Sequence, residues 1–212
     1  MLKDYELLPN GVVRQRKIRS HVSAFKDYKT HYDSLGDLTE KISFLRIGYL
    51  LGVIGIPRSL LDFGYGNGAF LSVARIAIQK CYGYEIKDYP IPESVTRINS
   101  FNHSYYDVVT FYDSLQYCTT IDFVRSLKCS FVVITVPECH RPTDTEWFIN
   151  WKHRRPDEHF YHFTRNALIQ FMAENGFSCI SIGNPEDIIR GNGHDDESNI
   201  MTGIFKKMTV NV

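Results

Sequence analysis

One short segment constrains the fold of this chain more than any other feature. Residues 60–71 read Leu-Leu-Asp-Phe-Gly-Tyr-Gly-Asn-Gly-Ala-Phe-Leu, an apolar run that ends in an acid, followed by three alternate glycines and more apolar residues. Glycine has no Cβ, so the backbone can turn sharply there and lie directly against a ligand. The segment therefore predicts a buried strand over residues 59–63, a ligand-binding turn and a helix over residues 69–79.

The groups around this turn suit one kind of ligand. A helix N-terminus offers unpaired N–H groups to a carboxylate, and Asp62 at the strand end can accept a hydrogen bond from an ammonium group. The Gly-x-Gly-x-Gly spacing differs from the Gly-x-Gly-x-x-Gly of dinucleotide-binding folds, which argues against a nicotinamide oxidoreductase. We expect the turn to contact its ligand through Gly64, Tyr65, Gly66, Asn67 and Gly68.

A second acid supports the same site. Residues 80–85 predict the next strand, and Glu85 stands at its end, 23 positions after Asp62 (85 − 62). In a doubly wound sheet the ends of adjacent strands lie side by side at the ligand crevice. A carboxylate placed there can accept hydrogen bonds from both hydroxyls of a ribose. The pattern thus predicts a site for an amino-acid group and a ribose.

The order of elements defines the fold class. Strands alternate with helices from residue 59 to residue 182, which is typical of an α/β fold with a mostly parallel sheet. Two final strands, over 177–182 and 199–206, have no predicted helix between them, so the last strand should run antiparallel. We predict a Rossmann-like, doubly wound, seven-stranded sheet in one domain over 1–212, with an N-terminal helical cap region over 1–57 and a ligand-binding core over 58–206.

Composition narrows the class of function. The chain has 24 basic and 24 acidic residues, and a net charge of zero argues against a protein that holds nucleic acid by its overall field. The longest apolar stretch, residues 47–56, is shorter than the ~20 residues that span a bilayer. Five cysteines without metal-ligand spacing predict reduced thiols, a cytoplasmic protein and no metal site.

The motifs together resemble those of class I S-adenosylmethionine (SAM) dependent methyltransferases over residues 28–206. The resemblance rests on the glycine turn, on Glu85, and on segments 107–109, 136–138 and 159–177, which are similar to further motifs of that class. It implies SAM as cofactor, S-adenosylhomocysteine as product, and methyl transfer to a small molecule such as a sugar, a lipid or a quinone-like acceptor. It also implies further cofactor contacts at Ile86, Asn99, Ser100, Asp113 and Ser114.

The connection over residues 137–163 is the candidate acceptor side. It is long, holds both tryptophans and four of the eight histidines, and leaves the carboxyl end of the fifth strand. Histidine acts as a general base near neutral pH, so His153 and His159 are the candidate catalytic residues. We expect this connection to cover the methyl donor together with Tyr28 and Tyr32.

Two alternatives to a small-molecule methyltransferase remain at this stage, and the oligomeric state and the need for a base stay open. A nucleic-acid methyltransferase that acts on exocyclic amines typically carries an Asn/Asp-Pro-Pro-aromatic motif after the fourth strand, where this chain has Asp-Ser-Leu-Gln. A SAM-binding partner protein without catalysis would keep the same ligand residues, and a homodimer is left open. Methyl transfer can also proceed by alignment of the reacting groups alone, without a general base.

Overall fold

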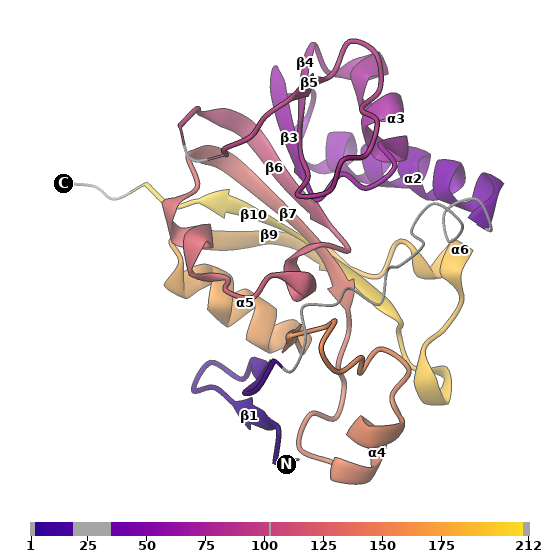
Figure 1. Ribbon diagram of the computed structural model, residues 1–212, viewed down its shortest axis with the longest axis vertical. Coiled ribbons are helices and arrows are strands. Elements are labelled where there is room, and N and C mark those ends of the chain that lie inside the picture. Colours follow the sequence, from indigo (N-terminus) through magenta and orange to yellow (C-terminus); the bar gives the residue numbers. More distant parts are fainter. Residues whose placement is uncertain (1–2, 19–34, 102, 210–212) are drawn as a thin grey trace.

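The centre of the molecule is one mixed sheet of seven strands (Figure 1). The computed structural model describes residues 3–18, 35–101 and 103–209. Neighbouring strands follow the order β5-β4-β3-β6-β7-β10-β9. Their bounds are β3 Ser59–Phe63, β4 Lys80–Tyr84, β5 Thr96–Arg97, β6 Tyr106–Tyr112, β7 Cys129–Pro137, β9 Phe177–Gly183 and β10 Ile200–Lys207.

The strand directions confirm the predicted fold class. Strands β5, β4, β3, β6 and β7 pair in parallel with their neighbours, whereas β10 pairs antiparallel with both β7 and β9. Between β9 and β10 the chain forms the four-residue helix α6 (Asp187–Arg190) and the 3-10 turn η3 (His194–Asp196). Neither element is a helix long enough to cross over a face of the sheet, as the connection between parallel strands usually does, and β10 returns antiparallel beside β9.

Helices cover both faces of this sheet. On one face lie α2 (Asp37–Ile54) and α3 (Ala69–Ala77), which pack on Leu60, Val108 and Val133. On the other face lies α5 (Arg165–Glu174), which packs on Leu61 and Val132. Alternate residues of each strand therefore enter opposite cores, as the two-residue period of a strand requires. Because both faces are buried, these strands read as continuous apolar runs.

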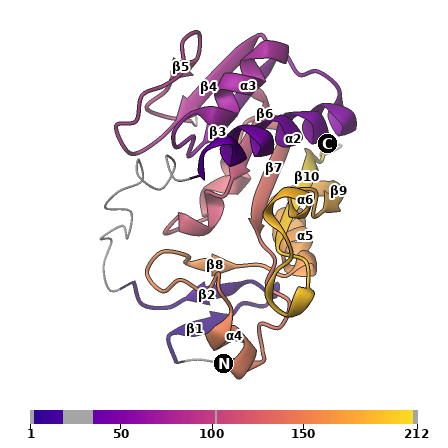
Figure 2. The same cartoon turned by 90° about the vertical axis from the view of Figure 1, so that its right-hand side faces the viewer.

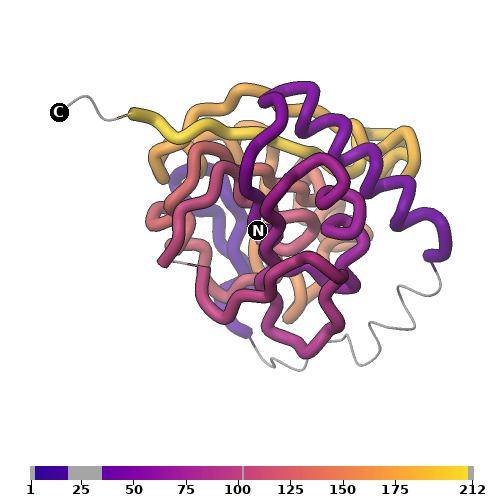
Figure 3. Tube along the Cα trace, turned by 90° about the horizontal axis from the view of Figure 1, so that it is seen from above, coloured from indigo at the N-terminus to yellow at the C-terminus, as the bar shows by residue number. Residues whose placement is uncertain are grey.

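Two helices are placed by features that the sequence carries. Helix α5 begins after Thr164, whose hydroxyl accepts a hydrogen bond from the Ala167 N–H. Helix α2 runs beside the C-terminal strands (Figure 3), where the Tyr49 and Ser181 hydroxyls are hydrogen-bonded at 2.7 Å. Between β6 and β7 the chain forms the 3-10 helices η1 (Leu115–Tyr117) and η2 (Asp122–Ser126).

The N-terminal segment differs from the prediction. Residues 5–15, expected as part of a helical cap, form strands β1 (Tyr5–Leu7) and β2 (Val13–Gln15) instead. With β8 (Tyr161–His162) they form a separate three-stranded sheet at one end of the molecule, in which β2 is the central strand (Figure 2). Tyr5 and Val13 face a small core that they share with α4 (Thr145–Asn150). Partners from the far end of the chain thus decide the structure here.

Tyr28 and Tyr32, which we expected to help cover the methyl donor, lie outside the described residues. No helix within the described ranges is long and apolar enough to cross a membrane.

Candidate functional site

The glycine turn after β3 depends on the absence of side chains. Gly64, Gly66 and Gly68 have φ angles of 78°, 54° and 76°, which L-residues rarely adopt. A Cβ at Gly64 would lie 2.7 Å from the Cβ of Ser114, and one at Gly68 would lie 2.7 Å from Cδ of Pro92. The turn is therefore tight for both conformational and steric reasons, and it brings the end of β3 against the residues that follow β6.

The other turn residues hold this shape. The Asn67 side chain accepts a hydrogen bond from the Ala69 N–H at the start of α3. The Tyr65 hydroxyl donates to the Tyr89 carbonyl, and its ring fills the space above Gly83 in β4. The turn is thus fixed against the neighbouring strand β4.

Asp62 is buried at the end of β3. Its carboxylate accepts a 2.7 Å hydrogen bond from the Thr110 hydroxyl in β6 and is 3 % exposed. Burial raises the pKa of Asp62 to about 7, although the Thr110 bond and nearby Arg46 act in the opposite direction. A cationic group bound beside this carboxyl would hold it ionised.

Glu85 follows β4 and faces the glycine turn. Its two carboxylate oxygens accept hydrogen bonds from the Gly66 N–H at 3.2 Å and the Lys87 N–H at 3.0 Å. Each oxygen has further lone pairs for a ligand hydroxyl. The predicted contacts after β4 and β5 lie along the same edge: Ile86 is 83 % exposed, and Asn99 and Ser100 are exposed.

Asp113, the first residue after β6, is held by two arginines. It has a φ of 55°, and its Oδ2 atom lies 2.6 Å from Arg46 in α2 and 2.6 Å from Arg190 in α6. Burial would raise the pKa of Asp113, but Arg190 and Arg46 lower it to about 2. Both arginines also pair with the buried Glu186, which closes a ring of two cations and two anions.

His153 and His159 lie in the connection between β7 and α5, and they hold each other in place. The His159 Nδ1–H donates to the His153 carbonyl at 2.8 Å, and the His153 Nε2–H donates to the Asn199 side-chain oxygen at 2.7 Å. Burial lowers the pKa of each ring to about 4, so both are neutral at pH 7. His153 is thus tethered through both its ring and its carbonyl.

His159 packs against the loop that follows β6. Its ring meets the Tyr117 ring edge-on at 4.7 Å, and the next residue, Phe160, donates its N–H to the Gln116 carbonyl. Within the described part of the chain, the Nε2 atom of His159 is buried without a hydrogen-bond partner. The structure therefore brings His159 to the carboxyl edge of the sheet, next to the segment that starts at Asp113.

Four residues of this region were not among the predicted site residues: Arg46, Gln116, Glu186 and Arg190. Arg46 is the one charged residue in segment 42–54, and that position could have marked it. Gln116 stands two residues after Ser114, which was a predicted cofactor contact. Glu186 and Arg190 stand in a polar loop whose sequence gives no sign of burial.

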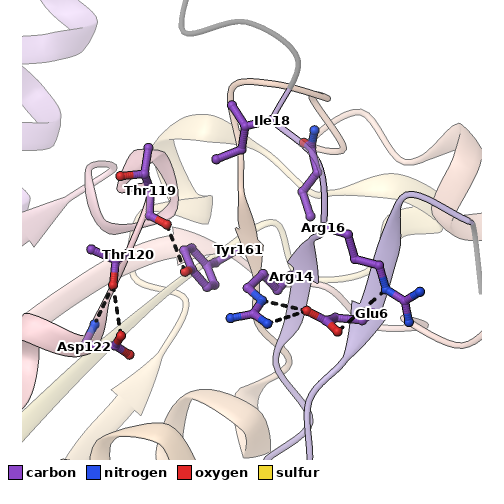
Figure 4. A pocket seen from close by; sticks show the side chains of 9 residues that line it. Glu6, Arg14, Arg16, Ile18, Thr119, Thr120, Asp122 and Tyr161 are labelled. Carbon is purple, nitrogen blue, oxygen red and sulfur yellow. Dashed lines mark hydrogen bonds and ion pairs between the residues drawn. The ribbon is translucent and has the colours of Figure 1, made fainter.

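A separate pocket of about 410 Å³ opens between the small sheet and the residues before η2 (Figure 4). Arg14 and Arg16 both pair there with Glu6, and the Tyr161 hydroxyl donates to the Thr119 carbonyl. None of the predicted cofactor or catalytic residues lines it. Its charges neutralise one another, so we place the functional site at the glycine turn instead.

Comparison with known proteins identifies the family of the chain. A family model described as a methyltransferase domain matches residues 36–182. The match spans more than half of the chain, so the chain belongs to this methyltransferase family, and its fold is that of the class I SAM-dependent methyltransferases. SAM is the methyl donor of this class. No curated protein matches the chain in sequence.

Solved structures share the fold at low sequence identity. The 1,6-didemethyltoxoflavin-N1-methyltransferase of Burkholderia thailandensis, solved with its substrate and S-adenosylhomocysteine, has a TM-score of 0.62 at 13 % identity, covering 86 % of this chain and 84 % of that one. A SAM-dependent methyltransferase from Clostridium acetobutylicum ATCC 824 has a TM-score of 0.60 at 9 % identity, covering 86 % and 99 %. Magnesium protoporphyrin IX methyltransferase from Synechocystis PCC 6803, with S-adenosylhomocysteine bound, has a TM-score of 0.55 at 13 % identity, covering 85 % and 95 %.

Proposed function

We propose that this chain binds SAM at the glycine turn and transfers its methyl group to a small molecule. The observation that carries the proposal is the convergence of Asp62, the positive-φ glycines and Glu85 at one edge of the sheet. The buried Asp62 carboxyl suits an ammonium group, and Glu85 suits the ribose hydroxyls. Gly64 and Gly68 leave room where a Cβ would collide with protein atoms.

Further contacts to the donor follow from position. Ile86 offers an exposed apolar side chain to the adenine ring of SAM, and Asn99 and Ser100 offer polar groups to the edge of that ring. Asp113 has one carboxylate oxygen occupied by the two arginines, while Ser114 packs against Gly64. These residues would complete the donor site along the ends of β4, β5 and β6.

The protein's own contribution to the reaction is mainly alignment. SAM, when bound, supplies a methyl group that is already activated on a sulfonium, so orientation of the acceptor supplies much of the rate. His159 presents a neutral imidazole whose Nε2 lone pair can accept the acceptor's proton or hold it in a hydrogen bond. His153 positions that ring through its carbonyl. In this proposal His159 contacts the acceptor, and His153 positions the His159 ring.

The acceptor class is proposed from charge and from the structural neighbours. The chain is neutral overall, which disfavours nucleic acid. The neighbours from Burkholderia and Synechocystis are named for a toxoflavin precursor and a magnesium porphyrin. A sugar, lipid or quinone-like acceptor stays a prediction, as do a homodimer and a cytoplasmic location.

Calorimetry tests the donor site. We expect SAM and S-adenosylhomocysteine to bind and NAD not to bind. Glu85→Ala should weaken SAM binding by about 1.5–3 kcal/mol, the range for hydrogen bonds to a charged group. Glu40→Ala, a change to an exposed acid on α2, is the matched control and should leave affinity unchanged. NAD binding without SAM binding would refute the proposal.

A labelling experiment tests the acceptor class. The protein and SAM with a labelled methyl group are incubated separately with a small-molecule extract, with RNA and with protein. Label should enter the small-molecule fraction. Label in RNA would favour a nucleic-acid methyltransferase, whereas SAM binding without label in any fraction would favour a non-catalytic partner protein.

A further inference from the structure

Three buried polar atoms in or beside the loop that follows β6 lack partners. Among the described residues, Ser114 Oγ, Gln116 Oε1 and His159 Nε2 are covered from solvent yet make no hydrogen bond. Gln116 is 2 % exposed and His159 is 3 % exposed. Buried polar atoms in folded proteins nearly always have a partner, so each exception needs an explanation.

These atoms belong to one corner of the molecule. Ser114 packs against Gly64 of the turn, and Gln116 lies two residues further along the same loop. The Gln116 carbonyl accepts the Phe160 N–H at 2.8 Å, which brings the neighbouring His159 to this loop. The corner therefore adjoins the donor turn on one side and the segment 159–160 on the other.

Two of the three atoms can only accept hydrogen bonds. The His159 Nδ1–H is already donated to the His153 carbonyl, so Nε2 carries a lone pair and no proton. The Gln116 Oε1 is a carbonyl oxygen and can also only accept. The Ser114 hydroxyl can donate or accept. A ligand that satisfies this corner must therefore donate hydrogen bonds to at least two acceptors.

We propose that the methyl acceptor is an uncharged molecule with two neighbouring O–H or N–H groups, which donate to Gln116 and His159. This inference rests on the proposed methyltransferase function and specifies its substrate class. Methyl transfer forms a bond from the acceptor oxygen or nitrogen to the methyl carbon and breaks the sulfur–carbon bond. The acceptor's proton leaves to His159 Nε2 or to solvent, and S-adenosylhomocysteine is the second product.

The same corner selects against other acceptors. A carboxylate brings only lone pairs, so it would face two acceptor atoms and leave both unpaired. A fully methylated ether or tertiary amide has no donor to offer. Gln116 is thus a specificity-determining residue, because its side-chain oxygen accepts a hydrogen bond from the second donor group of the substrate. The first donor group faces His159.

Matched probe pairs test this selectivity on protein saturated with S-adenosylhomocysteine. The pairs are catechol with 1,2-dimethoxybenzene and uracil with 1,3-dimethyluracil, and benzoate is the carboxylate probe; ligand-observed NMR titrations give the affinities. We expect at least one two-donor probe to bind about tenfold or more tightly than its methylated partner, since a site built to hydrogen-bond a group rejects analogues that lack it. Benzoate should bind more weakly than that probe.

Variants then assign the effect to Gln116. Gln116→Met removes the acceptor oxygen at similar size and should abolish the preference within the pair, whereas Gln116→Glu, which keeps the lone pairs, should retain it. Gln170→Met, a change to an exposed glutamine on α5, is the control. His159→Phe removes the second acceptor and gives an independent result if Gln116→Met does not fold.

The outcomes separate this inference from the proposed function. If S-adenosylhomocysteine does not bind, the proposed function fails. If it binds but no two-donor probe binds better than its methylated partner, or if benzoate binds best, the substrate class is wrong. An unchanged preference in folded Gln116→Met protein would remove Gln116 from the selectivity.

Discussion

Acidification should destabilise the connection that carries the candidate catalytic histidine. His159 and His162 are each 3 % exposed. Burial lowers the pKa of His159 to about 4 and that of His162 well below its ordinary value of 6.5. The His162 ring packs between Tyr5, Phe148 and Trp151. A proton on this ring would place a charge inside an aromatic cluster.

The magnitude follows from linkage between protonation and folding. Both histidines are neutral in the folded protein at pH 5, whereas in the unfolded chain they bind protons below pH 6.5. The unfolded state therefore gains protons first, and stability falls as the pH drops from 7 towards the folded pKa values. Between pH 7 and pH 5 each histidine should cost about 2 kcal/mol, or about 4 kcal/mol for the two.

Asp62 opposes part of this loss. Its folded pKa of about 7 lies above the unfolded value of 3.8, so the folded state takes up this proton first as the pH falls. Its contribution to stability therefore increases between pH 7 and pH 5, by about 2 kcal/mol. The pH dependence of the free energy of unfolding therefore combines contributions of opposite sign. The difference in this free energy between the wild type and a variant isolates the contribution of one histidine.

The assay compares urea unfolding of the wild type and His162→Leu at pH 7 and pH 5. Leucine has a similar size and does not titrate, so the stability difference between the two proteins should shift by about 2 kcal/mol in favour of the variant at pH 5. His103→Leu, at an exposed position, should follow the wild type. Equal pH dependence of wild type and His162→Leu would refute the reasoning.

Two further predictions concern the glycine turn. SAM affinity should rise with pH between 6 and 8 and weaken by up to about tenfold per pH unit below 7, because ammonium binding requires the Asp62 carboxylate; calorimetry across this range checks it, and Asp62→Asn should remove the dependence. Gly64→Ala should lower the free energy of unfolding by about 2 kcal/mol or more, since its φ of 78° suits glycine and the new Cβ would collide with Ser114; urea unfolding measures it, with Gly48→Ala in α2, where the space is open, as control.

The sheet could be predicted because its signals are local. The strands of the sheet core are buried on both faces and therefore read as apolar runs, as Leu60 and Leu61 illustrate. The glycine turn and the Thr164 cap also lie within a few residues of the elements they define. The final antiparallel strand followed from the absence of a predicted helix between the last two strands.

The N-terminal strands could not be predicted in this way. Strands β1 and β2 have three residues each, too few for an alternating pattern to identify a strand. Strand β2 pairs with β8, where Val13 lies opposite His162, and β1 pairs with β2. Pairing between the first and the last third of the chain depends on tertiary structure. No local sequence pattern in residues 5–15 argued against the expected helix.

The candidate site was predicted unevenly for the same reason. Asp62 lies at the end of β3, and the glycines and Glu85 follow the ends of β3 and β4. Because these two strands are parallel neighbours, the sheet alone places the residues together. The partners of Asp113 are distant in sequence: Arg46 lies 67 positions before it and Arg190 lies 77 positions after it. The Gln116 carbonyl accepts one backbone hydrogen bond from Phe160, the neighbour of His159, and no spacing rule specifies this pairing.

The ring formed by Arg46, Asp113, Arg190 and Glu186 links the two halves of the site. It joins α2, the loop after β6 and α6, and its charges sum to zero, so it can be buried without an unpaired ion. One residue beyond Asp113, Ser114 contacts Gly64 of the donor turn. The loop that carries Gln116 is thus anchored by charge on one side and by close packing on the other. An enzyme whose rate depends on alignment needs such anchoring, because small displacements between donor and acceptor are costly.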